Sequence, residues 1–128
     1  MPAHLHRLQS KLLIMNTLYF YTDSKSCESS PKVPDCRYFK KILSENPWPY
    51  TLIDVAGNQK IISDLRLIVG NLISFPQFII RDESDNLVTH FNSVLIKSKC
   101  SGNILEEAVF ISQATPLLEE KLKEFQVI

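Results

Sequence analysis

Residues 75–81 read FPQFIIR, and this apolar, β-branched run opened by a proline predicts a β-strand. Residues 82–86, DESDN, are polar and predict a turn. Residues 87–91, LVTHF, predict a second strand that forms a hairpin with the first. A proline at position 76 suits the beginning of a strand, because the ladder of hydrogen bonds does not need its missing N–H there.

Two more strands are predicted on the N-terminal side of the hairpin. Residues 17–22, TLYFYT, are aromatic and β-branched, and residues 50–55, YTLIDV, have a similar character. Residues 23–35 form a polar loop after the first of these strands, with two prolines and four serines. A helix is expected after each strand, which is the pattern of parallel strands joined by crossovers.

Each of these two helices is predicted to have one apolar face. Pro34 suits the first position of the first helix, and Asp35 favours the positive end of the helix dipole. Asn58 is the predicted N-cap of the second helix, and Gly70 is its predicted stop. The expected apolar faces comprise Cys36, Phe39, Ile42 and Leu43 in the first helix, and Ile61, Ile62, Leu65, Ile68 and Val69 in the second.

Helices are also predicted after the hairpin. Residues 93–99 form one candidate, residues 104–111 a separate helical turn, and residues 115–125 a last helix. Thr115 and Pro116 predict the beginning of that last helix, as a cap followed by a first-position proline. The predicted order is β-α-β-α-β-β-α, which implies an α/β fold with a central four-stranded mixed sheet flanked by helices.

Length and composition are typical of a globular protein. A chain of 128 residues buries enough surface for one core, and 45% hydrophobic with 22% charged residues are ordinary values. We therefore expect one domain over residues 15–128. Residues 1–14 contain no acidic residue, and we expect a disordered leader there, with a short targeting peptide or a start at Met15 as alternatives.

Charge and cysteine content limit the expected partners. Lys and Arg total 14 and Asp and Glu also total 14, which argues against binding to nucleic acid or to an acidic membrane surface. No apolar run approaches the ~20 residues of a membrane-spanning helix. Three cysteines suit a reducing compartment, so we expect a cytoplasmic protein. Their spacing offers no zinc site, so no metal is expected.

Three stretches of the chain resemble glutaredoxins, a family with the thioredoxin fold. The first is the strand at residues 18–22, which leads into a helix start bearing a cysteine. The second is LIDV at residues 52–55, followed by a helix that ends at Gly70. The third and most specific is SFPQFII at residues 74–80, similar to the family's threonine, valine, cis-proline and glutamine before an apolar strand. The resemblance spans residues 17–91 and implies a thioredoxin-like fold.

The same resemblance suggests glutathione as a cofactor. It implies a cis peptide bond before Pro76, and a backbone at Phe75 that pairs with a bound thiol substrate as an added strand. Lys32, or alternatively Lys25, would match the lysine with which glutaredoxins bind glutathione. The family's Gly-Gly turn after the fourth strand is absent, because residues 92–93 are Asn-Ser; their side chains are candidates for binding a carboxylate instead.

The first helix departs from the family's active-site motif. Glutaredoxins carry Cys-Pro-Tyr-Cys or Cys-Gly-Phe-Ser at this helix start, and the leading cysteine is the nucleophile. Counted back from Asp54, residues 33–36, Val-Pro-Asp-Cys, fall on that motif. Cys36 then takes the second, resolving position, while Val33 occupies the position of the nucleophile and has no lone pair with which to attack.

Cys27 is the candidate that compensates for this loss. It lies in a loop longer than the family usually has, and the short ring that it would close with Cys36 costs little entropy. Two other registers remain open. Residues 27–30 read Cys-Glu-Ser-Ser, a monothiol pattern, whereas residues 30–36 resemble the loop before a monothiol cysteine and make Cys36 the nucleophile.

Cys36 is the thiol that we expect to be better activated in either case. Its place in the first helical turn puts it near unpaired N–H groups and the positive end of the dipole. Lys32 and Arg37 are neighbouring cations, which favour a thiolate, while Asp35 opposes them. Cys100 is expected to be a bystander near a helix end.

Two functions follow as hypotheses. The first is a glutaredoxin- or thioredoxin-like thiol–disulfide oxidoreductase that acts on protein or glutathione disulfides, with Cys36 and Cys27 as catalytic residues. The alternative is a redox-inactive thioredoxin-fold binding or adaptor module, in which Val33 marks the lost chemistry. We expect a monomer.

Overall fold

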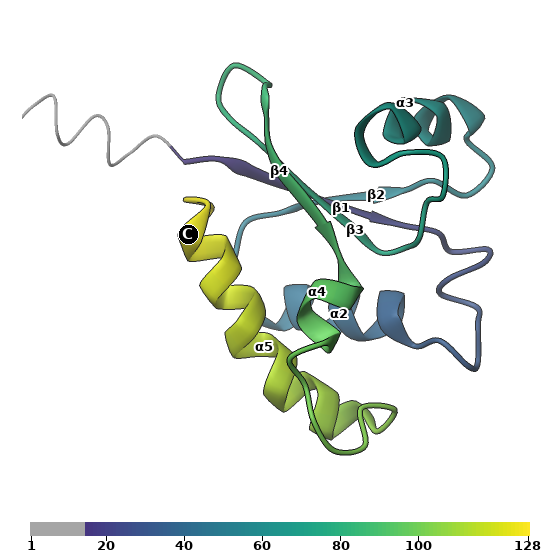
Figure 1. Cartoon of the computed structure of the whole chain (residues 1–128), viewed down its shortest axis with the longest axis vertical. Coiled ribbons are helices and arrows are strands. Elements are labelled where there is room, and N and C mark those ends of the chain that lie inside the picture. Colours follow the sequence, from purple (N-terminus) through teal and green to yellow (C-terminus); the bar gives the residue numbers. More distant parts are fainter. Residues whose placement is uncertain (1–14) are drawn as a thin grey trace, which may run out of the picture.

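The computed structural model of the chain describes residues 15–128, which form four strands and four helices (Figure 1). These elements are β1 (Thr17–Thr22), α2 (Asp35–Glu45), β2 (Thr51–Asp54), α3 (Gln59–Val69), β3 (Gln77–Arg81), β4 (Leu87–Asn92), α4 (Ser93–Lys97) and α5 (Glu107–Glu124). The disordered leader expected at residues 1–14 lies outside the described residues.

The four strands form one mixed sheet in the order β2-β1-β3-β4. β1 runs parallel to β2 and antiparallel to β3, and β4 is the hairpin partner of β3. In this register Tyr21 of β1 lies opposite Ile53 of β2 and Gln77 of β3. The predicted four-stranded mixed sheet with flanking helices is therefore confirmed.

On one face of the sheet lie α2, α4 and α5 (Figure 1). The ring of Phe78 in β3 stacks on Phe91 of β4, with centroids 4.8 Å apart, and meets the edge of Phe39 in α2 at 5.2 Å. Phe39 in turn meets Phe110 of α5 at 5.3 Å. All four rings are buried, so this face is a closed aromatic core that holds α2 and α5 against the sheet.

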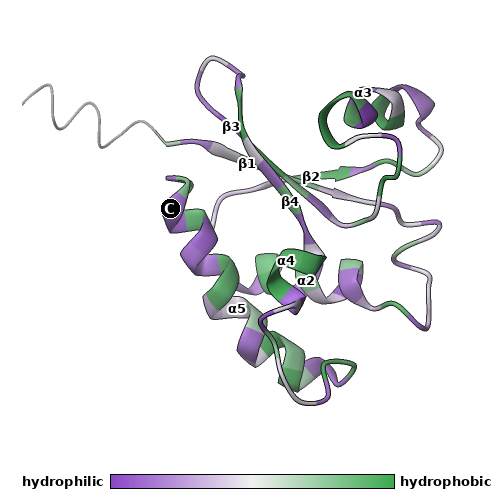
Figure 2. Cartoon of the chain, in the orientation of Figure 1, coloured by the Kyte–Doolittle hydropathy of each residue, from purple (hydrophilic) through white to green (hydrophobic). Residues whose placement is uncertain are grey.

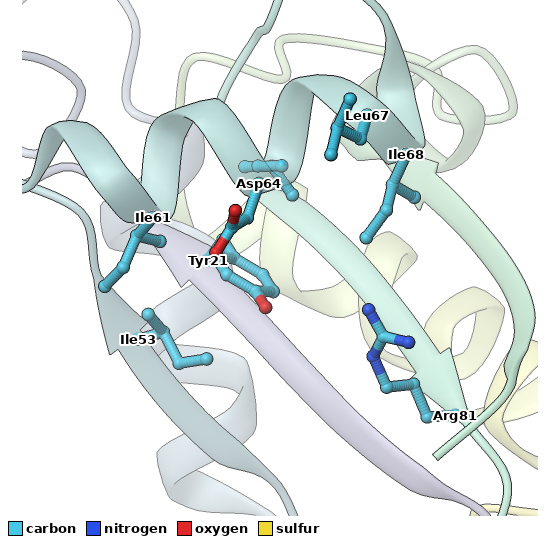
Figure 3. A pocket seen from close by; sticks show the side chains of 8 residues that line it. Tyr21, Ile53, Ile61, Asp64, Leu67, Ile68 and Arg81 are labelled. Atoms are coloured by element: carbon cyan, nitrogen blue, oxygen red, sulfur yellow. The ribbon is translucent and has the colours of Figure 1, made fainter.

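The opposite face carries α3 alone (Figure 1). Leu65 is the one residue of α3 that is buried, so the apolar face predicted for this helix is covered only in part. An open cavity of about 430 Å³ remains between α3 and the sheet, bordered by Tyr21, Ile53 and Ile68 among others (Figure 3). The Tyr21 ring is half-buried at this boundary, and its burial raises the pKa of the phenol.

The ends of α2 and α3 follow the sequence predictions closely. Asn58 caps α3, since its Oδ1 accepts the N–H of Ile61 at 3.1 Å. Gly70 ends the same helix with a φ of 94°, a conformation that favours glycine. Pro34 was predicted to be the first residue of α2, but the helix begins one residue later at Asp35, so Pro34 is its N-cap.

The C-terminal helix differs from the prediction. A single helix, α5, replaces the separate turn expected at residues 104–111 and the helix expected to begin at Thr115. Pro116 lies inside α5, where it removes one main-chain hydrogen bond. Residues spaced by four keep the helix continuous because they share one buried face. They are Phe110, Ala114, Leu118 and Leu122.

Candidate functional site

A disulfide joins the long loop between β1 and α2 to the first turn of α2. Cys27 lies in the loop and Cys36 is the second residue of the helix, and their Cα atoms are 5.9 Å apart. This separation lies in the range that disulfides require. Of the pairings that the sequence left open, the structure therefore contains the one between Cys27 and Cys36.

The disulfide lies against the turn that opens β3. The Sγ atom of Cys27 is 3.4 Å from the main-chain carbonyl oxygen of Phe75. The Phe75–Pro76 peptide bond is cis, as predicted. Phe75 is half-buried and Pro76 is buried. Four of the five predicted site residues, Cys27, Cys36, Phe75 and Pro76, therefore meet at one place.

The two sulfurs differ in their access to solvent. Cys36 has an exposed fraction of 0%, whereas Cys27 is partly exposed. A sulfur that attacks a substrate must be reachable, so burial argues against the expectation that Cys36 attacks first. The more exposed cysteine of the pair is Cys27.

A set of hydrogen bonds holds the loop of Cys27 against α2 and β1. Arg37 of α2 donates from Nη1 to the carbonyl oxygens of Glu28, at 3.1 Å, and Ser30, at 2.5 Å. The carboxylate of Glu28 accepts a hydrogen bond from Thr22 and pairs with Lys40, each at 3.0 Å. These contacts hold Glu28, the residue next to Cys27, against both α2 and β1.

From the sequence, Arg37 is expected to act as a cation beside the thiolate, and nothing in the sequence singles out Glu28. The structure uses the Arg37 guanidinium to bind loop carbonyls instead. The helix spacing does place Arg37 and Lys40 three residues apart on neighbouring positions of one face. That spacing alone did not indicate which loop residue they would bind.

The carboxylate of Asp35 is buried next to the disulfide-bearing residue. It accepts a hydrogen bond from Ser93 Oγ at 2.6 Å and pairs with Lys97, whose Nζ is 3.1 Å from both oxygens. Asp35 thus ties the beginning of α2 to α4, and Lys97 balances the charge that was expected to oppose a thiolate at Cys36. No side chain caps the N-terminus of α2, so main-chain N–H groups of its first turn stay uncapped near Cys36.

The residues that were candidates for binding glutathione do not gather at the disulfide as the cysteines and Phe75 do. Lys32 is exposed and takes part in no ion pair within residues 15–128. Ser93 is buried and bound to Asp35. Asn92 caps α4 by accepting the N–H of Val94 at 3.0 Å, and it donates to Ser74 Oγ at 3.2 Å. Residues 92–93 therefore serve the fold, where the sequence had made them candidates for a ligand carboxylate.

The remaining predicted features lie apart from the disulfide. Cys100 keeps a free thiol, which donates to the carbonyl of Ile96 at 3.5 Å, and burial raises its pKa. His90 is exposed on β4. Across residues 15–128, no group of three or more His, Cys, Asp or Glu side chains is placed to hold a metal ion. Over the same range, no helix combines the length and apolarity needed to cross a membrane.

Comparisons with known proteins do not assign a function to this site. No protein family, curated protein or solved structure matches this chain.

Proposed function

We propose that this chain is a thiol–disulfide exchange protein with a thioredoxin-like fold, similar to glutaredoxins. The observation that carries the proposal is the Cys27–Cys36 pair at the start of α2, with the Cys27 sulfur 3.4 Å from the Phe75 carbonyl. The β-α-β-α-β-β order and the sheet order β2-β1-β3-β4 are compatible with that fold. By composition, we place the protein in a reducing compartment such as the cytoplasm.

In this proposal Cys27 is the sulfur that exchanges with substrate, and Cys36 is its internal partner. A substrate thiolate attacks Cys27 Sγ. A bond forms between the substrate sulfur and Cys27 Sγ, and the Cys27–Cys36 bond breaks, with Cys36 leaving as a thiolate. A second substrate thiolate attacks the substrate sulfur of this mixed disulfide, which forms the substrate disulfide and releases Cys27 as a thiolate. Two substrate thiols are oxidised and one protein disulfide is reduced. The reverse sequence reduces a substrate disulfide.

The surroundings of Cys36 favour its role as the leaving thiolate. It is the second residue of an 11-residue helix without a side-chain cap, so the positive end of the helix dipole stabilises negative charge there. Lys97 balances the nearby Asp35 carboxylate. A leaving group does not need to be reached by the substrate, but burial costs a thiolate its hydration, so in this proposal the helix dipole offsets that cost.

In this proposal the main chain of Phe75 is the surface along which the substrate binds. Phe75 precedes β3, so its main-chain groups are not part of the ladders that β3 makes with β1 and β4. An extended substrate segment with its cysteine at Cys27 would run along this free backbone as an added strand. Protein disulfides and glutathione both satisfy this requirement.

The test compares Cys36→Ser with Cys27→Ser, each combined with Cys100→Ser so that one thiol remains. Each reduced protein is incubated with glutathione disulfide, and the adducts are followed by mass spectrometry. We expect Cys36→Ser to accumulate a stable glutathione adduct at Cys27, because the sulfur that would release it is absent. Cys27→Ser should react at least about tenfold more slowly, because its remaining sulfur is buried.

A second measurement separates exchange chemistry from a structural disulfide. The oxidised wild-type protein is titrated with glutathione, and the fraction of reduced pair is measured at equilibrium. A pair that resists a large excess of glutathione, together with no adduct on Cys36→Ser, would falsify the exchange proposal. Those results would favour the redox-inactive binding module, in which Val33, 46% exposed at the family's nucleophile position, marks the lost chemistry.

A further inference from the structure

A groove opens beside the proposed exchange site. Its volume is about 470 Å³, and its walls are Ile62 and Arg66 of α3 and the segment that follows this helix up to Phe75. Phe75 belongs both to this groove and to the site, because its carbonyl oxygen contacts the Cys27 sulfur at 3.4 Å. A molecule bound to Cys27 therefore has the groove as its immediate neighbour.

The segment that borders the groove between α3 and β3 exposes apolar side chains. Leu72, in the segment after α3, has an exposed fraction of 98%, and Ile73 and Phe75 are only half-buried. In Figure 2 the segment between α3 and β3 has hydrophobic stretches alternating with polar ones. A single exposed leucine is common on protein surfaces, but several exposed or half-buried apolar residues in one short segment, one of which contacts the Cys27 sulfur, are typical of a contact surface.

Arg66 is the one charged residue among those lining the groove. Its guanidinium makes no hydrogen bond or ion pair with any group in the described part of the chain. Lys60 on the same helix differs, since its Nζ lies 3.2 Å from a carboxylate oxygen of Asp64. The cation at the groove is therefore available to a carboxylate from another molecule, which a guanidinium binds well.

We infer that this groove selects protein substrates in which an apolar side chain and a carboxylate lie next to the reactive cysteine. The inference rests on the proposed exchange function and names its substrate class. The apolar side chain covers Leu72 and Ile73, and the carboxylate pairs with Arg66, while the substrate cysteine reaches Cys27 along Phe75. Glutathione has carboxylates but no large apolar side chain, so it uses the groove only in part.

The test uses two synthetic peptides that differ only in charge. Both carry a leucine next to a cysteine activated as a mixed disulfide with 2-thiopyridine; one has glutamates beside the leucine and the other has lysines. The Cys27 thiolate of the reduced protein attacks the peptide sulfur, and the released 2-thiopyridone is followed by absorbance. We expect the acidic peptide to react about two- to fivefold faster, the range of one exposed ion pair, with a smaller ratio at high salt.

Two variants and two matched controls sharpen the result. Arg66→Glu should reverse the order of the two peptides, and Leu72→Ser should slow both about two- to fivefold through lost apolar contact. Lys60→Glu makes the same charge change on the same helix outside the groove. Leu67→Ser removes a leucine that is 88% exposed and borders the other cavity. Both controls should keep the rates of the wild-type protein.

The outcomes distinguish this inference from the proposed function. If the wild-type protein reacts with the neutral reagent 2,2′-dipyridyl disulfide at Cys27 but treats both peptides alike, the groove inference is wrong and the exchange function stands. The same conclusion holds if Lys60→Glu changes the peptide preference as much as Arg66→Glu. If Cys27 does not react even with the neutral reagent, both proposals fail together.

Discussion

The two faces of the sheet hold their helices in different ways. On one face, α2 and α5 meet the sheet through four buried aromatic rings whose centroids lie 4.8–5.3 Å from their neighbours. On the other face, α3 buries only Leu65 and leaves a cavity of about 430 Å³ beneath it (Figure 3). Regions with few buried contacts open at lower free energy than a packed core, so we expect α3 to be the more adjustable of the two layers.

This difference bears on the candidate site, which lies where the two faces meet. Cys36 is wholly buried in the helix that belongs to the closed face. Cys27 is partly exposed, and the groove next to it has α3 as one wall. The internal sulfur is thus supported by a rigid core, whereas the surface proposed to receive substrates belongs to the loosely packed side. Such a division suits a site that must hold one sulfur still and admit varied partners to the other.

The largest expected effect comes from breaking the closed face. Phe78→Ala removes a ring that stacks on Phe91 and meets Phe39 and Phe20 at 5.2 Å. We expect the free energy of unfolding to fall by about 3–5 kcal/mol, because a rigid aromatic core cannot collapse around so large a void. Urea unfolding followed by circular dichroism measures the change. A loss below about 2 kcal/mol would show that this face is not the rigid layer.

A smaller effect is expected on the face of α3. Leu65→Ala removes the only buried side chain of that helix. We expect a loss of about 2 kcal/mol, at the low end for such a truncation, because α3 can settle onto the sheet and the adjoining space is already an open cavity. The same unfolding experiment compares the two variants directly. A loss equal to that of Phe78→Ala would contradict the difference between the faces.

Most of the closed face was predictable from sequence, because it follows from short-range periodicity. The four strands, the hairpin and the apolar face of α2 that includes Phe39 and Ile42 are all present, although β2 is shorter than the predicted 50–55 and β3 begins at Gln77, two residues later than predicted. The exception is α5, where Pro116 suggested a helix start. There the burial of one continuous apolar face, which includes Phe110 and Leu118, outweighs the hydrogen bond that the proline removes.

The candidate site was predictable only in part. Spacing and resemblance singled out Cys27, Cys36 and the turn before β3, and the structure brings these residues together. The relative access of the two sulfurs was not predictable, because it depends on how an irregular loop of 12 residues between β1 and α2 folds back. The contacts that hold this loop, such as the one from Arg37 to the Glu28 carbonyl, follow no periodic pattern.

The smallest expected effect concerns Cys100, which packs against the edge of the closed face. Burial raises the pKa of its thiol, so less thiolate is present at neutral pH than in a free cysteine. In the oxidised protein it is the only remaining thiol, since the chain has three cysteines and two are paired. We expect iodoacetamide to alkylate it a few-fold more slowly than a cysteine peptide near pH 7.5, with the difference narrowing as pH rises. Mass spectrometry measures both rates, and equal rates near neutral pH would mean that water reaches this edge and that the closed face is less sealed than its aromatic centre.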